Sequence, residues 1–267
     1  MKRKLNTLSY LYLFFLALLF LSGGVSGFLG EVVYLLAFLL PLGIGIYLSR
    51  DEYPTVDFKM DREKVNFTLP LIIPTVAVTL LLSYLTGLLI FVTTGRVNSV
   101  DMGDSFLLAI ISHAIMPAVL EELLFRYLPI RFLADRSERL CIFASAFFFS
   151  LVHHDLFSIH YTFVAGMILM SVDIATESIL PSILIHFINN ALSVCMVMYG
   201  DNPVFLTSFY SLIAILTVVS VIIIVIRRKK YAQEFETAFY CDERLIFTLD
   251  MWIFLGITMT LAIIQLM

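Results

Sequence analysis

The stretch DSFLLAIISHAIMPAVLEELLFRYLPI, residues 104–130, decides the fold class. It is long and apolar enough to cross a bilayer, because a spanning helix needs roughly 20 mostly apolar residues. Yet the same stretch contains Glu121, Glu122 and Arg126. A charged side chain in mid-bilayer costs on the order of 2.5–3.5 kcal/mol on insertion scales, so buried ionisable groups are functional candidates. The stretch predicts a membrane helix that carries a charged site.

The rest of the chain has the same apolar character. Its 267 residues are 60% hydrophobic and only 14% charged, with a mean hydropathy of +0.97. A soluble domain would carry about a quarter charged residues. We therefore predict an all-α, polytopic membrane helical bundle of eight or nine transmembrane helices in the cell membrane. The apolar runs lie at residues 8–27, 29–48, 67–94, 104–130, 138–154, 157–175, 179–199, 204–226 and 245–266.

The basic residues predict the orientation of this bundle. With nine spans and a cytoplasmic N-terminus, 15 of the 17 Lys and Arg residues fall in cytoplasmic segments. The exceptions are Arg96, in an outer loop, and Arg126. Positive residues are enriched on the cytoplasmic side of membranes, so we expect a cytoplasmic N-terminus. The basic start resembles a secretory signal, but its apolar run is long and a second span follows closely, which favours a retained helix.

The chain shows no internal repeat, so we expect residues 1–267 to form one integral-membrane domain. The polar residues 227–244 are expected to form a cytoplasmic linker. Cys141, Cys195 and Cys241 lie far apart, which predicts neither a disulfide framework nor a cysteine metal site. The composition indicates the lipid bilayer as a partner and argues against nucleic acid. It does not specify the oligomeric state.

Three polar clusters interrupt the apolar runs. In the first, Glu122 and Arg126 are four residues apart, in the favourable order for an ion pair on one helix face. Glu121 points about 100° away round the helix, so it must meet a group from another helix or stay uncharged. The alternative without a function is that this segment is only the charged end of a span. His113, about two turns before Glu121, can line the same cavity.

The second and third clusters repeat the four-residue spacing. Phe149 lies one turn before His153, and His186 lies one turn before Asn190. His153 also fits an interfacial histidine, and the His186 and Asn190 pair also fits polar contacts between helices. Glu121 and His153 are each about 24 Å along their helices from the turn near Ser137, so we expect them at the same depth.

These residues suit peptide hydrolysis, which needs an activated water, a proton donor for the leaving amine and a stabiliser of the oxyanion. Glu121 can take a proton from water, and His153 can orient that water. His186 and Asn190 can donate hydrogen bonds to the oxyanion. Alternatively, Glu121, His153 and His186 form a set of zinc ligands with an open position for water, and Glu122 acts as base. The absence of HExxH argues against the metal.

The motifs are similar to those of the CPBP intramembrane proteases, also called the Abi or type II CAAX prenyl endopeptidase family. EELLFR (121–126) matches EExxxR, FSLVH (149–153) matches FxxxH and HFINN (186–190) matches HxxxN, in the family's order. The stretch TESILPSILIHFINN (176–190) resembles the approach to the third motif in bacterial members, although Glu177 stands where relatives often have glycine. The resemblance covers about residues 104–199.

The resemblance implies an all-helical intramembrane endopeptidase with residues 104–199 as its catalytic core. It implies membrane-associated or lipidated peptides as substrates, without choosing among prenylated CAAX tails, bacteriocin maturation and self-immunity. Glu121 and His153 would activate water, while Glu122 and Arg126 would hold the first motif in place. His186 and Asn190 would stabilise the oxyanion. The family is conventionally described as metalloproteases, although a glutamate-dependent mechanism is also described, so zinc stays open.

Two alternatives come from other functional classes. The first is a family member that has lost catalysis and serves as a bacteriocin immunity or scaffold protein. The second is a transporter that uses the buried ionisable groups as an ion relay. The complete motif set argues against the first alternative. The lack of an inverted repeat argues against the second.

Overall fold

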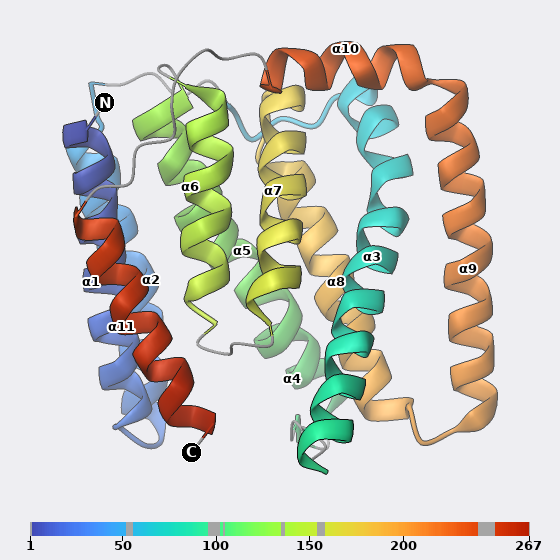
Figure 1. Ribbon diagram of the computed structural model, residues 1–267, viewed down its shortest axis with the longest axis horizontal. Helices are drawn as coiled ribbons and strands as arrows, with labels where there is room; N and C mark the ends of the chain where they lie inside the picture. The colour runs from blue at the N-terminus through green and yellow to red at the C-terminus, as the bar shows by residue number, and fades with distance from the viewer. Residues whose placement is uncertain are drawn as a thin grey trace.

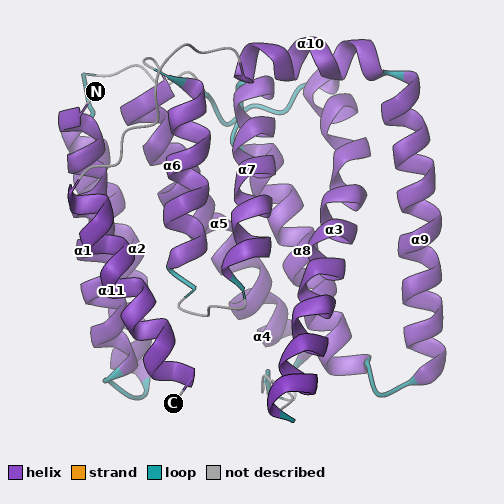
Figure 2. Ribbon diagram, in the orientation of Figure 1, coloured by secondary structure: helices purple, strands orange, loops and turns teal. Residues whose placement is uncertain are grey.

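The computed structural model describes residues 2–51, 56–95, 102–103, 105–134, 137–153, 158–239 and 249–266. Figure 2 shows that the regular structure in these ranges is helical. The helices before the first motif are α1 (Lys2–Gly23), α2 (Phe28–Leu48) and α3 (Arg62–Thr94). Those that follow the first motif are α6 (Glu138–Leu151), α7 (Ile159–Thr176), α8 (Leu180–Tyr199), α9 (Pro203–Ile226), α10 (Arg228–Phe239) and α11 (Leu249–Leu266).

The first motif lies on an irregular helix that runs from Phe106 to Ala134. Its α-helical parts are α4 (Phe106–Ile110) and α5 (Met116–Glu122). Three π-helical turns alternate with them, at Ile111–Ile115, Leu123–Tyr127 and Ile130–Ala134. Short π-helical turns are often found at functional sites. Here one of them follows Glu122 directly and includes Arg126.

Seven of the nine predicted spans are helices that are long and apolar enough to cross a membrane. The chain is therefore a multi-pass membrane protein. The remaining two predicted spans are also helical, but α6 has 14 residues and the described apolar part of α11 is only Asp250–Leu261. Of the eight or nine predicted spans, these seven are confirmed. The way α6 begins and ends explains why this helix is too short to count as a span. Ser137 caps its N-terminus by accepting from the N–H of Leu140, and the helix ends at Leu151.

Figure 1 shows the long helices side by side in alternating directions, with α10 lying across one end of the bundle. The same end holds the start of α1, the end of α2, the starts of α3 and α6, and the end of α9. Of the basic residues predicted to be cytoplasmic, those in the described ranges, such as Arg3, Arg50, Arg62, Arg139 and Arg228, adjoin these helix ends and gather at one end of the bundle. Which side of the membrane that end faces stays a prediction.

The predicted linker, residues 227–244, contains a helix. Helix α10 carries the buried Tyr231, whose hydroxyl donates to the carbonyl of Phe67 on α3 at 2.9 Å. Burial raises the pKa of this tyrosine. Lys230, next to it, pairs with Glu63 at 2.6 Å. The segment is thus anchored to the start of α3 over residues 228–239, while residues 240–248 lie outside the described ranges.

The core sits where α1, the motif helix and α6 meet. Tyr12, Phe125 and Phe148 are fully buried there, with ring centroids 5.1 Å apart for Tyr12 and Phe125 and 4.4 Å apart for Tyr12 and Phe148. In contrast, α9 exposes large apolar side chains along most of its length, as expected of a helix against lipid. The first motif is therefore held inside the protein.

Candidate active site

Glu122 and Arg126 form a buried ion pair, as their spacing predicts. Both side chains are 0% exposed, and Arg126 Nε lies 3.1 Å from Oε2 of Glu122, without hydrogen-bond geometry. Removing one partner of a buried ion pair costs about 3–5 kcal/mol, because the other charge is left uncompensated. Glu122 and Arg126 therefore form a charged site in the interior of the protein. The alternative expectation, that this segment is only the charged end of a span, is wrong.

A proline explains why this charged turn bonds to α6. Pro129 has no N–H, so it cannot donate to the carbonyl of Phe125 one turn earlier. That carbonyl accepts instead from Ser145 Oγ of α6 at 2.5 Å and from Nη1 of Arg126 at 3.4 Å. Arg126 Nη1 also lies 3.3 Å from Ser145 Oγ. The carbonyl group that the proline frees thus fixes the arginine to a second helix.

His186 of α8 joins the two glutamates. Its Nδ1 lies 2.7 Å from Oε1 of Glu122, and its Nε2 lies 3.8 Å from Oε2 of Glu121. An ionised carboxylate only accepts hydrogen bonds, so Nδ1 carries a proton. The longer distance exceeds a direct hydrogen bond but suits a bridging water. The expectation that Glu121 meets a group from another helix is confirmed, and that group is His186.

Phe149 of α6 brings the three motifs together. The guanidinium carbon of Arg126 lies 4.2 Å from the centroid of its ring. The rings of His153 and His186 approach it edge-on, with centroids 5.0 and 5.9 Å away. Cation–π contacts of this kind hold an arginine without competing for its hydrogen-bond donors. The aromatic residue of the second motif therefore touches residues of all three motifs.

His153 lies in the turn after α6 and is exposed. Its Nδ1 lies 2.9 Å from the backbone carbonyl of Phe149. A carbonyl can only accept, so Nδ1 donates, and the neutral ring keeps a lone pair on Nε2. Among the described residues no hydrogen bond or ion pair joins His153 to Glu121. The structure places His186, rather than His153, beside Glu121.

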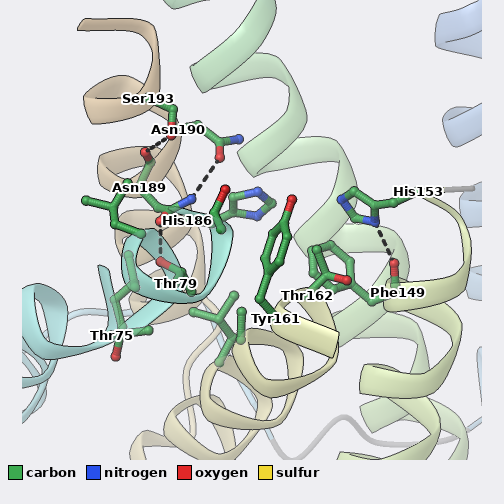
Figure 3. Close-up of a pocket in the computed structure, with 15 residues that line it drawn as sticks. Thr75, Thr79, Phe149, His153, Tyr161, Thr162, His186, Asn189, Asn190 and Ser193 are labelled. Carbon is green, nitrogen blue, oxygen red and sulfur yellow. Dashed lines mark hydrogen bonds between the residues drawn. The ribbon is translucent and has the colours of Figure 1, made fainter. Parts of the chain in front are cut away.

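A cavity of about 270 Å³ opens between α3, α6, α7 and α8. Figure 3 shows His186, Asn190 and Tyr161 around its centre, with His153 on one side and Thr79 on the other. Its lining includes many hydroxyl and amide groups, which is unusual inside a helical membrane protein. Its full lining is Thr75, Thr79, Leu80, Ser83, Phe149, His153, Tyr161, Thr162, Ala165, Leu169, Ile185, His186, Asn189, Asn190 and Ser193.

Glu121 and His113 do not line this cavity. The side chain of Glu121 is 17% exposed, and its Oε2 lies 3.8 Å from Nε2 of His186, which does line the cavity. His113 lines a different cavity, together with Glu31 and Tyr34 at the turn between α1 and α2. The expectation that His113 shares a cavity with the motif residues is therefore not met.

Another buried carboxylate, that of Asp173 on α7, lies near the ion pair. It is fully buried, and its Oδ1 accepts from the backbone N–H of Ser182 in the first turn of α8, at 3.1 Å. Its Oδ2 makes no hydrogen bond within the described residues. Asp173 thus holds the start of the helix that carries His186, one turn after Ser182.

The turn between α7 and α8 has an unusual backbone. Glu177 has φ 50° and ψ 35°, the left-handed region that glycine adopts at least cost. Its carbonyl accepts from the N–H of Asp57 at 3.0 Å, and Ser178 Oγ donates to the carbonyl of Lys59 at 2.7 Å. The N–H of Lys59 lowers the pKa of Asp57, with a further contribution from the Lys64 ammonium. A glycine, which the resemblance leads us to expect at this turn, would adopt this conformation without the cost that a side chain brings.

The tentative metal set is not assembled in this arrangement. Within the described ranges no three His, Cys, Asp or Glu side chains group closely enough to hold a metal ion. Glu121 and His186 approach each other, but His153 lies apart across Phe149. The residues present do not fit a three-ligand zinc site here, and zinc stays a prediction.

Two features of the site were missed by sequence reasoning although each left a signal. Asp173 lies inside a predicted span, so the cost of a charged side chain in the bilayer marks it as a functional candidate, as it does Glu121. Thr75, Thr79 and Ser83 follow each other at four-residue intervals, which places three polar side chains on one face of α3. Asn189 and Tyr161 had no distinguishing pattern.

The arrangement defines a class of protein: a helical membrane protein with a buried glutamate–histidine pair beside a polar cavity. Residues 103–192 match the family model described as type II CAAX prenyl endopeptidase Rce1-like. The chain therefore carries an Rce1-like type II CAAX prenyl endopeptidase family domain, which confirms the resemblance seen in the three motifs. No curated protein and no solved structure matches the chain.

Proposed function

We propose that the protein is an intramembrane endopeptidase that hydrolyses peptide bonds of membrane-associated or lipidated peptides. The observation that carries this proposal is the position of His186, with Glu122 on Nδ1 at 2.7 Å and Glu121 near Nε2 at 3.8 Å, at the edge of a polar cavity. The family domain supports the same reaction class.

In the proposed mechanism Glu121 activates the attacking water. A water that bridges Glu121 Oε2 and His186 Nε2 would be held by two groups that can accept its proton. The buried pair of Glu122 and Arg126 keeps the Nδ1 side of His186 occupied, so the ring cannot turn away. This division gives the two adjacent glutamates different tasks, one on water and one on the histidine.

The other two motif residues face the substrate. Because Nδ1 of His153 donates to the carbonyl of Phe149, its Nε2 is left toward the cavity, where it can take up a proton from water and then give that proton to the leaving amine. The side-chain amide of Asn190 can donate to the oxyanion that forms on the scissile carbonyl. The polar lining of the cavity, about 270 Å³ in volume, can replace backbone hydrogen bonds that a peptide segment would lose in the membrane.

The test compares wild type with Glu121→Gln, purified in detergent. Each is incubated with a membrane-proteome peptide library and with a farnesylated peptide that ends in a CAAX sequence. Loss of a general base is expected to lower the cleavage rate by about 10²–10⁴-fold. Glu31→Gln is the matched control, since Glu31 lines the other cavity, and it should retain full cleavage. Metal content measured on the same samples decides whether zinc takes part.

Equal cleavage by wild type and Glu121→Gln would refute the proposed mechanism. A chain that cleaves nothing in either form, yet keeps its fold and membrane level, would favour the immunity or scaffold alternative. A transporter would instead change proton or ion flux into vesicles when Glu121 is replaced.

A further inference from the structure

Helix α3 lies before the family domain, yet it contributes one face of the cavity. Thr79 is 7% exposed and its hydroxyl donates to Oδ1 of Asn189 at 2.7 Å. Its distance to the carbonyl of Val76 on its own helix is longer, 2.9 Å. Because a hydroxyl has a single proton, the shorter contact directs that proton to the amide of α8. A residue outside the matched range is thus joined to the helix of the third motif.

This first hydrogen bond determines the orientation of two amides. With Oδ1 of Asn189 occupied by Thr79, its Nδ2 is the group that faces the neighbouring side chain, and it donates to Oδ1 of Asn190 at 3.3 Å. Figure 3 shows the three side chains in this succession along the cavity wall. Because Oδ1 of Asn190 is turned toward Asn189, its Nδ2 is the end of the amide that points away from Asn189 and can donate to a ligand. No hydrogen bond among the described residues uses that Nδ2.

We propose that Thr79 is a positioning residue that orients Asn190, through Asn189, so that its NH2 group rather than its carbonyl oxygen faces the reacting peptide bond. The proposal rests on the proposed function, in which Asn190 stabilises the oxyanion. An amide turned by 180° would present an oxygen to a developing negative charge and would repel it. Without Thr79 nothing in the described residues selects between the two orientations of the Asn189 amide.

Thr79→Val is the direct test, because valine keeps the shape of threonine and removes the hydroxyl. We expect a loss in kcat of about tenfold, the scale of one neutral hydrogen bond, with KM unchanged because substrate binding precedes oxyanion formation. Thr79→Ser restores the hydroxyl and should restore kcat. Thr217→Val is the matched control, since Thr217 of α9 does not line this cavity and its hydroxyl donates to the carbonyl of Ile213 on its own helix at 2.7 Å.

Three outcomes overturn the proposal. The first is a Thr79→Val enzyme whose kcat equals that of Thr217→Val. The second is a rise in KM without a fall in kcat, which indicates a substrate contact. The third is a loss that Thr79→Ser fails to restore. Asn190→Ala separates this failure from that of the proposed function: it should lower kcat by about 10²–10³-fold, and full activity in that variant would refute the role of Asn190 itself.

A measurement without substrate tests the same hydrogen bonds. In protein labelled with ¹⁵N at asparagine, the side-chain amide signals of Asn189 and Asn190 are assigned by their loss in Asn189→Asp and Asn190→Asp. Thr79→Val should shift both pairs of signals, whereas Thr217→Val should shift neither. Unchanged signals in Thr79→Val would overturn the proposal even if no cleaved peptide were known.

Discussion

The two sides of His186 differ in what they contain. On the Nδ1 side, Glu122 and Arg126 are charged and fully buried, with Asp173 close by. On the side of the cavity lie Asn189, Asn190 and Thr79. All three are neutral and line the cavity, and the two asparagines are only partly buried. Buried charges that pair with each other hold the residues around them in one position. Neutral groups at a cavity can instead exchange their hydrogen-bond partners for a ligand. The first side therefore fixes the histidine, and in the proposed function the second side binds the substrate.

The contrast is sharpest between the adjacent residues Glu121 and Glu122. They share a residue type and a helix, but one is 17% exposed and the other 0% exposed. Glu122 has two firm partners, Arg126 and His186, whereas Glu121 has one distant partner. Substitution of the two sides should consequently give two different defects, instability on one and loss of turnover on the other.

Arg126→Ala should give the largest effect on stability. It leaves the carboxylate of Glu122 buried without its cation, a change that costs about 3–5 kcal/mol. We expect a large fall in the midpoint of thermal or denaturant unfolding in detergent. Arg62→Ala, at the exposed start of α3, is the control and should change the free energy of unfolding by less than about 0.5 kcal/mol. Similar losses in both variants would contradict the division of the site into two sides.

Much of this division could be predicted from the sequence. The apolar runs predicted the helices, and the four-residue spacing of Glu122 and Arg126 predicted their pairing, because both follow from local helix geometry. The same geometry showed that Glu121 needs a partner from another helix. It could not identify His186 as that partner, since the contact depends on how two distant helices cross.

Among the described residues no hydrogen bond or ion pair joins Glu121 to His153, despite their equal predicted depth, and the cause is physical. Counting residues from the turn near Ser137 assumed regular α-helices, but π-helical turns occupy Leu123–Tyr127 and Ile130–Ala134 and change the rise and direction of the helix. Likewise α6 ends at Leu151, so His153 belongs to a turn and not to a helix face. The polar face of α3 was readable from its spacing, but its contact with α8 depends on tertiary packing.

Gly166→Ala tests whether Phe149, which contacts residues on both sides, is held in place by the close crossing of α6 and α7. Its effect on stability should be intermediate. A Cβ at Gly166 of α7 would lie 2.9 Å from the Cα of Ala146 and 3.4 Å from Cδ1 of Phe149. A backbone atom cannot move aside alone, so α6 and α7 must separate, at a cost of about 1–3 kcal/mol. Because Phe149 contacts Arg126 and both histidines, we expect unfolding at lower denaturant together with a reduced cleavage rate.

Gly87→Ala in α3 is the control for this substitution, since a Cβ at Gly87 would meet no other atom within 4 Å. It should not lower stability, because alanine is a better helix former than glycine. If Gly166→Ala were as stable and as active as Gly87→Ala, the close crossing of α6 and α7 would not hold Phe149 in place.

Glu177→Gly should give the smallest effect, and a favourable one. The left-handed conformation costs a residue with a side chain roughly 1–2 kcal/mol, part of which glycine loses again through its freer unfolded state, so a gain of about 1 kcal/mol is expected in the free energy of unfolding. The carbonyl that accepts from Asp57 belongs to the backbone and is retained.

Glu177→Ala separates the two possible causes, because it removes the carboxylate but keeps the strained φ angle of 50°. An equal gain in Glu177→Ala would assign the effect to charge. Since Glu177 is exposed and lines neither side of His186, cleavage should be unchanged in both variants, and a changed rate would mean that this turn controls access to the site.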